Sequence, residues 1–153
     1  MANSKEKIAE FVRNNEFYYP YPDAIPRMHR MLKIDRSITN INIKDSTWAD
    51  YTALHSQSWY GTTGSVAWLL WQDPPPDIEV QLLDQRTPLF DAAVSQVDSE
   101  GKVRHLLDHG ANRDARNMRG LTALDYARLW NKNPAALAAV ADMLENYRPD
   151  VSR

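Results

Sequence analysis

Residues 87–93 read Thr-Pro-Leu-Phe-Asp-Ala-Ala, and this stretch decides the fold because it recurs in phase along the chain. Thr-Ala-Leu-His at 52–55 precedes it and Thr-Ala-Leu-Asp at 122–125 follows it, so that 52 to 87 and 87 to 122 are both 35 positions. In each copy the threonine can cap a short helix, and the proline at position 88 is tolerated in a first turn. Three phased copies indicate a repeat protein.

A second apolar pattern follows each copy. The pattern is Val-x-x-Leu-Leu or a close variant, and it occurs at 66–70, 103–107 and 140–144. Apolar residues at positions i, i+3 and i+4 occupy one face of a helix. Each unit is therefore predicted to be a pair of helices, and the fold class to be all-α.

The second unit resembles an ankyrin repeat, whose signature is Thr-Pro-Leu-His-x-Ala. The resemblance continues through Leu-Leu-Asp-His-Gly-Ala-Asn at 106–112 and Gly-Leu-Thr at 120–122. Gly110 stands where such repeats need a left-handed residue after the second helix, and Gly120 stands at the turn of the next finger. The resemblance implies a solenoid of stacked helix pairs with β-hairpin-like fingers.

The whole chain, residues 1–153, is expected to form a single ankyrin-repeat domain. Its period of 35 exceeds the usual 33, and the extra residues are expected in loops at 73–77, 94–102 and 130–134. End units of a solenoid need a polar outer face and so depart from the pattern. The expected parts are a degenerate capping repeat at 1–44, repeats at 45–86, 87–121 and 122–147, and a frayed tail at 148–153.

Composition narrows the possible partners and sites. The net charge is −2, so no overall cationic field attracts nucleic acid or an anionic membrane. The sequence has no cysteine, which removes disulfides, thiol nucleophiles and zinc–thiolate sites. No apolar run reaches membrane-spanning length. We expect an intracellular, cytoplasmic protein, with the nucleus left open, that is a monomer or self-associates through an end repeat.

No set of residues for catalysis is evident. The resemblance implies that His55 hydrogen-bonds the backbone between neighbouring repeats. His105 and His109 are four positions apart, a spacing that only weakly suggests a metal site. We therefore expect a protein that is not an enzyme and that has no cofactor and no bound metal.

The aromatic content points to a binding surface. The chain has 5 Trp and 7 Tyr in 153 residues. In ankyrin proteins the variable positions lie at the finger tips and on the exposed side of each first helix, which together line the concave face. A surface with Trp, Tyr, Arg and Met has the composition of an interface hot spot. The residues expected to bind a partner protein are Tyr51, Trp59, Tyr60, Arg86, Asp91, Met118, Arg119, Tyr126 and Trp130.

The leading interpretation is a protein-binding module that acts as an adaptor or as a stoichiometric inhibitor. Two alternatives remain open from the sequence. The inserted loops could fold the aromatic residues into satellite cores. The aromatic residues could also frame a small-molecule or catalytic pocket near the first two repeats, with His55 or Asp91 as its polar group.

Overall fold

The computed structural model of the protein describes residues 52–72 and 75–148. Within these ranges the chain is helical and contains six helices, in agreement with the predicted all-α class. The helices are α3 (Ala53–Tyr60), α4 (Thr63–Leu70), α5 (Pro88–Val94), α6 (Ser99–Asp108), α7 (Ala123–Trp130) and α8 (Pro134–Asn146). The predicted capping repeat at 1–44 lies outside the described residues, and the predicted domain boundaries stay a prediction.

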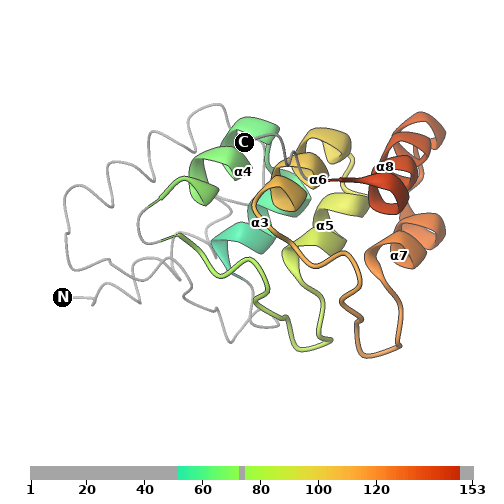
Figure 1. The fold of residues 1–153 in the computed structure, drawn as a ribbon, viewed down its shortest axis with the longest axis horizontal. Helices are drawn as coiled ribbons and strands as arrows, with labels where there is room; N and C mark the ends of the chain where they lie inside the picture. Colours follow the sequence, from blue (N-terminus) through green and yellow to red (C-terminus); the bar gives the residue numbers. More distant parts are fainter. Residues whose placement is uncertain (1–51, 73–74, 149–153) are drawn as a thin grey trace.

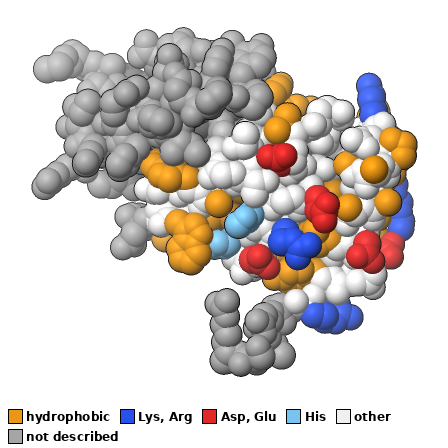
Figure 2. All heavy atoms as spheres, turned by 90° about the horizontal axis from the view of Figure 1, so that it is seen from above, with side chains coloured by type: hydrophobic (Ala, Val, Ile, Leu, Met, Phe, Trp, Pro, Cys, Tyr) orange, Lys and Arg blue, Asp and Glu red, His pale blue; other side chains and the backbone are white. Residues whose placement is uncertain are grey.

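The six helices form three pairs stacked side by side in two rows (Figure 1). One row holds α3, α5 and α7, and the other holds α4, α6 and α8. Each helix packs against the helix of its own pair and against its neighbour in the same row. Seen from the side of the second row, Lys and Arg side chains are interspersed with Asp and Glu (Figure 2). None of the described helices has the length and apolarity needed to cross a lipid bilayer.

The first helix of each pair begins at a threonine, as the sequence predicts. The side chains of Thr52 and Thr122 accept a hydrogen bond from the backbone three residues later, and Asp125 completes a capping box with Thr122. Thr87 makes no side-chain cap. The N–H of Phe90 donates to the carbonyl oxygen of Thr87 at 3.1 Å instead, so the cap predicted at Thr87 is wrong in its hydrogen bond although the helix begins there.

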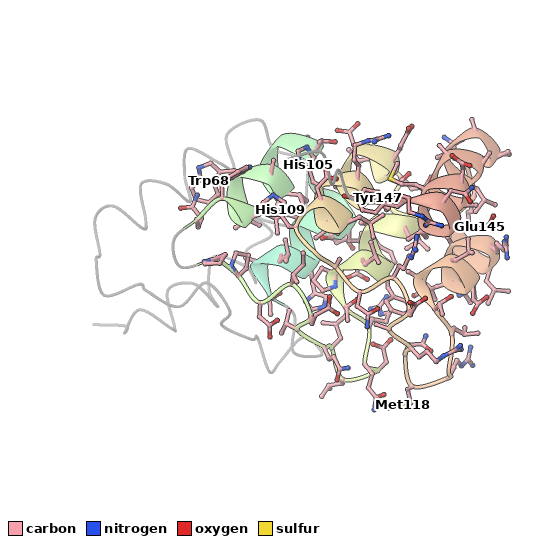
Figure 3. The ribbon with its side chains drawn as sticks, viewed as in Figure 1. Trp68, His105, His109, Met118, Glu145 and Tyr147 are labelled. Carbon is pink, nitrogen blue, oxygen red and sulfur yellow. The ribbon has the colours of Figure 1, made fainter. Side chains whose placement is uncertain are left out.

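Two fingers project from the row of first helices, at residues 78–87 and 112–121 (Figure 1). Backbone hydrogen bonds close each tip, from Leu82 N–H to Arg86 O and from Asn117 N–H to Leu121 O, both at 2.9 Å. The Met118 N–H donates across to the carbonyl oxygen of Asp84 at 2.9 Å and so joins neighbouring fingers. Met118 lies at a finger tip, far from the helices (Figure 3).

The turn after α6 and the finger at 112–121 use glycine as predicted. Gly110, just after α6, has φ +93°, and Gly120, in the finger, has φ +77°. Only glycine adopts this left-handed conformation without steric cost. The expected long bend at 94–102 is shorter than predicted, because residues from Ser99 onward extend α6.

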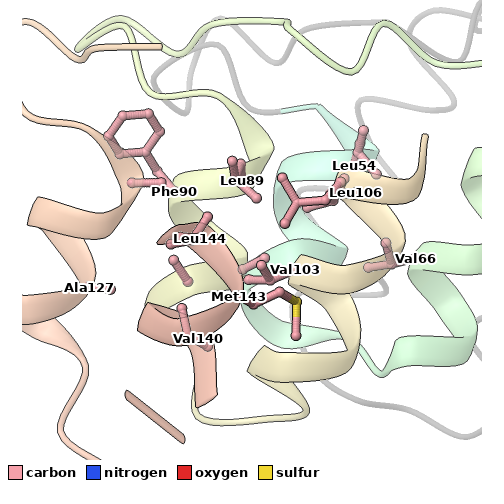
Figure 4. Close-up of a cluster of buried hydrophobic side chains, with 14 of the residues drawn as sticks. Leu54, Val66, Leu89, Phe90, Val103, Leu106, Ala127, Val140, Met143 and Leu144 are labelled. Atoms are coloured by element: carbon pink, nitrogen blue, oxygen red, sulfur yellow. The ribbon is translucent and has the colours of Figure 1, made fainter. Parts of the chain in front are cut away.

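The hydrophobic core runs between the two rows through all three pairs (Figure 4). Each predicted Val-x-x-Leu-Leu pattern contributes its apolar face, so the helical periodicity is confirmed. The core members from these patterns are Val66, Leu69, Leu70, Val103, Leu106, Leu107, Val140, Met143 and Leu144. Leu54, Leu89 and Ala123 supply the facing contacts from the first helices.

Candidate functional site

A groove with a volume of about 570 Å³ crosses the carboxyl-terminal ends of the first helices. It joins three of the predicted partner-binding residues, each a large aromatic side chain, with three residues that were not predicted. The groove is lined by Trp59, Val94, Gln96, Tyr126, Trp130 and Lys132, and is called the aromatic groove below.

The repeat explains why these residues meet. Trp59, Val94 and Trp130 lie near or at the end of α3, α5 and α7, and their spacings are 94 − 59 = 35 and 130 − 94 = 36. Gln96 and Lys132 follow in the loops that lead to the second helices, 132 − 96 = 36 positions apart. Sequence reasoning missed Gln96 and Lys132. Each follows the last residue of a first helix, Val94 or Trp130, by two positions, so the helix ends relate them and the 35-residue period does not.

The Arg86 side chain holds the rings of Trp59 and Tyr126, which form two sides of the groove. Its guanidinium lies 5.7 Å from the ring centroid of Trp59 and 5.7 Å from that of Tyr126, so it is held between both rings. The same side chain donates a hydrogen bond to the hydroxyl oxygen of Tyr126 at 2.9 Å. An ion pair with Asp84 at 2.9 Å holds the guanidinium from the finger side. Only 12% of the Arg86 side chain is exposed. Arg86 therefore holds the rings that line the groove and offers little surface to a partner.

Asp91 does not point outward, and its predicted place on a partner-binding surface is corrected. Its side chain is fully buried and lies 3.2 Å from the Arg86 guanidinium. Its oxygens make no hydrogen bond among the described residues, so this contact is an ion pair alone. Burial raises the pKa of Asp91 to about 7, against the attraction of Arg86, which lowers it. Arg86 turns inward from the finger and covers this position of α5.

Buried polar side chains tie the loops behind the groove to the preceding helix pair. The Ser95 hydroxyl donates to the carbonyl oxygen of Trp59 at 2.6 Å, and the Asn131 amide donates to that of Ala93 at 2.8 Å. The Lys102 ammonium is buried and donates to Ser95 Oγ at 2.7 Å and to the carbonyl oxygen of Gly61 at 2.9 Å. Burial lowers the pKa of Lys102 to about 7. The end of α3 is therefore fixed to the second pair.

The remaining predicted residues do not share the groove. Tyr60 is half-buried, packs against the core and contacts the ring of Trp59 at 6.1 Å. Met118 is 64% exposed and Arg119 is exposed, both at a finger tip away from the groove lining. Tyr51 lies outside the described residues. The predicted site thus separates into a groove at the helix ends and a finger tip.

Among the described residues, His55 and His109 make contacts through their rings. His55 Nε2 lies 3.1 Å from the carbonyl oxygen of Arg86 in the next finger, which confirms the predicted bond between repeats. Because a carbonyl only accepts, this nitrogen carries the hydrogen, and neutral Nδ1 accepts from the Thr52 hydroxyl at 2.8 Å. The ring of His109 packs edge-on against exposed Trp71 at 5.3 Å. Among the described residues no group of three His, Asp or Glu side chains is placed to hold a metal ion.

A second hollow lies between α6 and α8 and has a different character. Its volume is about 520 Å³, and its lining carries charges of both signs, including Glu100, Arg104, Asp108, Asp142 and Arg148. Positively and negatively charged side chains on such a surface largely neutralise one another. The aromatic groove is therefore the stronger candidate for recognition of a partner.

The family model for the ankyrin repeat matches residues 84–118. Residues 84–118 of the chain are therefore an ankyrin repeat. The match begins in one finger, includes α5 and α6 and ends in the next finger, and the flanking helix pairs repeat the same arrangement. No curated protein matches the chain. Ankyrin repeats are protein–protein interaction modules that typically lack catalytic activity.

Proposed function

We propose that the protein is a non-catalytic binding module that recognises another protein through the aromatic groove, as an adaptor or as a stoichiometric inhibitor. The proposal rests on one observation: the groove is lined by Trp59, Tyr126 and Trp130 together. Aromatic side chains dominate the energetics of protein interfaces because they bury a large area and lose little conformational entropy.

Contacts within the protein hold the sides of the groove in place, which favours binding. Trp59 and Tyr126 are held by Arg86, and the loops behind them are held by Ser95 and Asn131. A preorganised surface loses less entropy when a partner binds than a surface that must first become ordered. The polar groups considered for a small-molecule pocket, His55 and Asp91, are both fully buried and outside the groove lining.

A pair of matched substitutions on α7 tests the proposal. Trp130 is 52% exposed and lines the groove, whereas the neighbouring Leu129 is 61% exposed and does not. Partners are recovered from the native source on immobilised wild-type protein, Trp130→Ala and Leu129→Ala, and are quantified by mass spectrometry. We expect a specific partner to be lost with Trp130→Ala and retained with Leu129→Ala, with unchanged circular dichroism for both variants.

Equal recovery of the same partner by the folded Trp130→Ala variant would exclude the groove as its binding site. Met118→Ala then distinguishes the second surface, because Met118 is exposed at the finger tip and away from the groove. Loss of the partner with Met118→Ala would assign recognition to the fingers.

A further inference from the structure

Among the side chains that line the aromatic groove, hydrogen-bond donors outnumber acceptors. The indole N–H groups of Trp59 and Trp130 and the ammonium of Lys132 can only donate, and Gln96 carries both a donor and an acceptor. Within 52–72 and 75–148 these two indole groups and this ammonium have no hydrogen-bond or ion-pair partner. These side chains can therefore donate to more acceptors than they themselves supply.

The hydroxyl of Tyr126 adds a further donor. Arg86 donates to the oxygen of Tyr126 at 2.9 Å, so the hydroxyl hydrogen is not used in that bond. A positive group on the oxygen polarises the O–H bond and strengthens its donation to an anion. Arg86 thus both holds the Tyr126 ring and prepares its hydroxyl to meet a negative charge.

Among residues 52–72 and 75–148, no carboxylate lines the groove to balance Lys132. The nearby carboxylates are occupied by the protein itself: Asp91 is buried against Arg86, and Asp84 pairs with the same guanidinium. Asp125 on α7 is held in its capping box with Thr122. An anionic ligand would therefore meet one uncompensated cation and no opposing acid in the groove lining.

We propose that the aromatic groove binds a segment of a partner protein in which a large apolar side chain stands beside a carboxylate. The apolar side chain packs against Trp59, Val94 and Trp130, and the carboxylate accepts from Lys132 and Tyr126. Charge complementarity carries the choice of an acidic segment. This inference rests on the proposed function, because it names the chemistry that the same groove recognises.

Selection from a random peptide library displayed on phage tests the inference with a defined probe. The wild-type protein and Trp130→Ala are immobilised separately, and the enriched sequences are compared. Wild type is expected to enrich sequences with Asp or Glu within two positions of an aromatic or branched aliphatic residue. Those sequences are expected to be absent from the selection on Trp130→Ala.

Synthetic peptides of an enriched sequence then measure the charge directly by fluorescence anisotropy. Lys132→Glu is expected to weaken binding about fivefold, as for loss of one exposed ion pair, and Lys132→Gln is expected to lie between. Peptides made with free and amidated carboxyl termini distinguish a chain-terminal carboxylate from a side-chain carboxylate. Higher salt is expected to weaken binding to wild type more than to Lys132→Glu.

The inference is overturned if no sequence is enriched, if the enriched sequences are neutral or basic, or if acidic peptides bind Lys132→Glu as tightly as wild type. Its failure is distinguishable from failure of the proposed function. Neutral apolar peptides that bind wild type and not Trp130→Ala would leave the groove as the binding site and refute only its preference for a carboxylate.

Discussion

The two junctions between helix pairs are built from different chemistry at the same repeat position. His55 and Phe90 are 35 positions apart and equivalent in the repeat, 90 − 55 = 35. His55 reaches the backbone of the next finger at Arg86, whereas Phe90 packs edge-on against the ring of Tyr126 with centroids 5.6 Å apart. Buried Lys102 adds further hydrogen bonds to the first junction.

This difference shows that the repeat determines where helix pairs meet but not which interactions hold them together. A polar junction depends on hydrogen bonds whose geometry must be satisfied, since an unpaired buried group destabilises the fold. An aromatic junction depends on buried area and on close packing. The two junctions should therefore respond differently to truncation and to pH.

The largest expected effect is at the aromatic junction. Phe90→Ala removes a fully buried ring and is expected to lower the free energy of unfolding by about 3–5 kcal/mol. Urea denaturation followed by circular dichroism measures the loss. Phe90→Leu, which keeps most of the apolar volume, is the control and should lose clearly less. Equal losses in both variants would contradict a junction held by aromatic area.

A smaller effect is expected at the polar junction. His55→Ala leaves the Arg86 carbonyl and the Thr52 hydroxyl without their ring partner, and is expected to cost about 1–3 kcal/mol. The same denaturation experiment applies, with His105→Ala on α6 as a half-buried histidine control. If His55→Ala is no more harmful than the control, the hydrogen bond between repeats does not hold this junction.

The third expected effect is a pH dependence of stability beside the polar junction. The pKa of Asp91 is raised from 3.8 to about 7, so the folded protein keeps a proton that the unfolded chain releases between these values. Stability is therefore expected to fall as pH rises from about 4 to 7. Lys102 has the opposite effect above pH 7, because its pKa is lowered from 10.5 to about 7 and stability recovers as pH rises towards 10.5.

Asp91→Asn is expected to reduce the loss of stability between pH 5.5 and 7.5 by about 2 kcal/mol. Exposed Asp142 on α8 provides the control, since Asp142→Asn should leave the wild-type pH profile unchanged. Denaturant midpoints at both pH values give the measurement. A profile for Asp91→Asn that follows wild type would show that Asp91 is not the titrating group.

The fold was more predictable from the sequence than the site. The phased threonines and the Val-x-x-Leu-Leu patterns determine where helices start and which face is buried, because helical periodicity and capping are local properties. They predicted the three helix pairs that the structure contains, although α6 begins inside the bend expected at 94–102. The resemblance to the ankyrin repeat placed Gly110 at a left-handed position and Gly120 at a finger turn, and both have positive φ.

The environment of each site residue was less predictable, because it depends on contacts between units. The sequence could not show that Arg86 turns inward and buries Asp91, since this follows from one rotamer of a long side chain. The repeat pattern also assigns both Met118 and Trp130 to variable positions. It does not show that Met118 lies at a finger tip whereas Trp130 lines the groove. Lys132 was not accessible from the 35-residue period, which relates Gln96 to Asn131; it shares with Gln96 only a place two residues after a first helix.

The position of Arg86 limits how this protein can be recombined. Repeat proteins are often treated as interchangeable modules, because each unit contacts only its neighbours. Here the guanidinium of Arg86, in the finger before α5, contacts both Trp59 on α3 and Tyr126 on α7, so all three helix pairs contribute to one contact. A chimera that exchanged any one of these units would lose a wall of the groove, so its recognition surface is transferable only as a block of three.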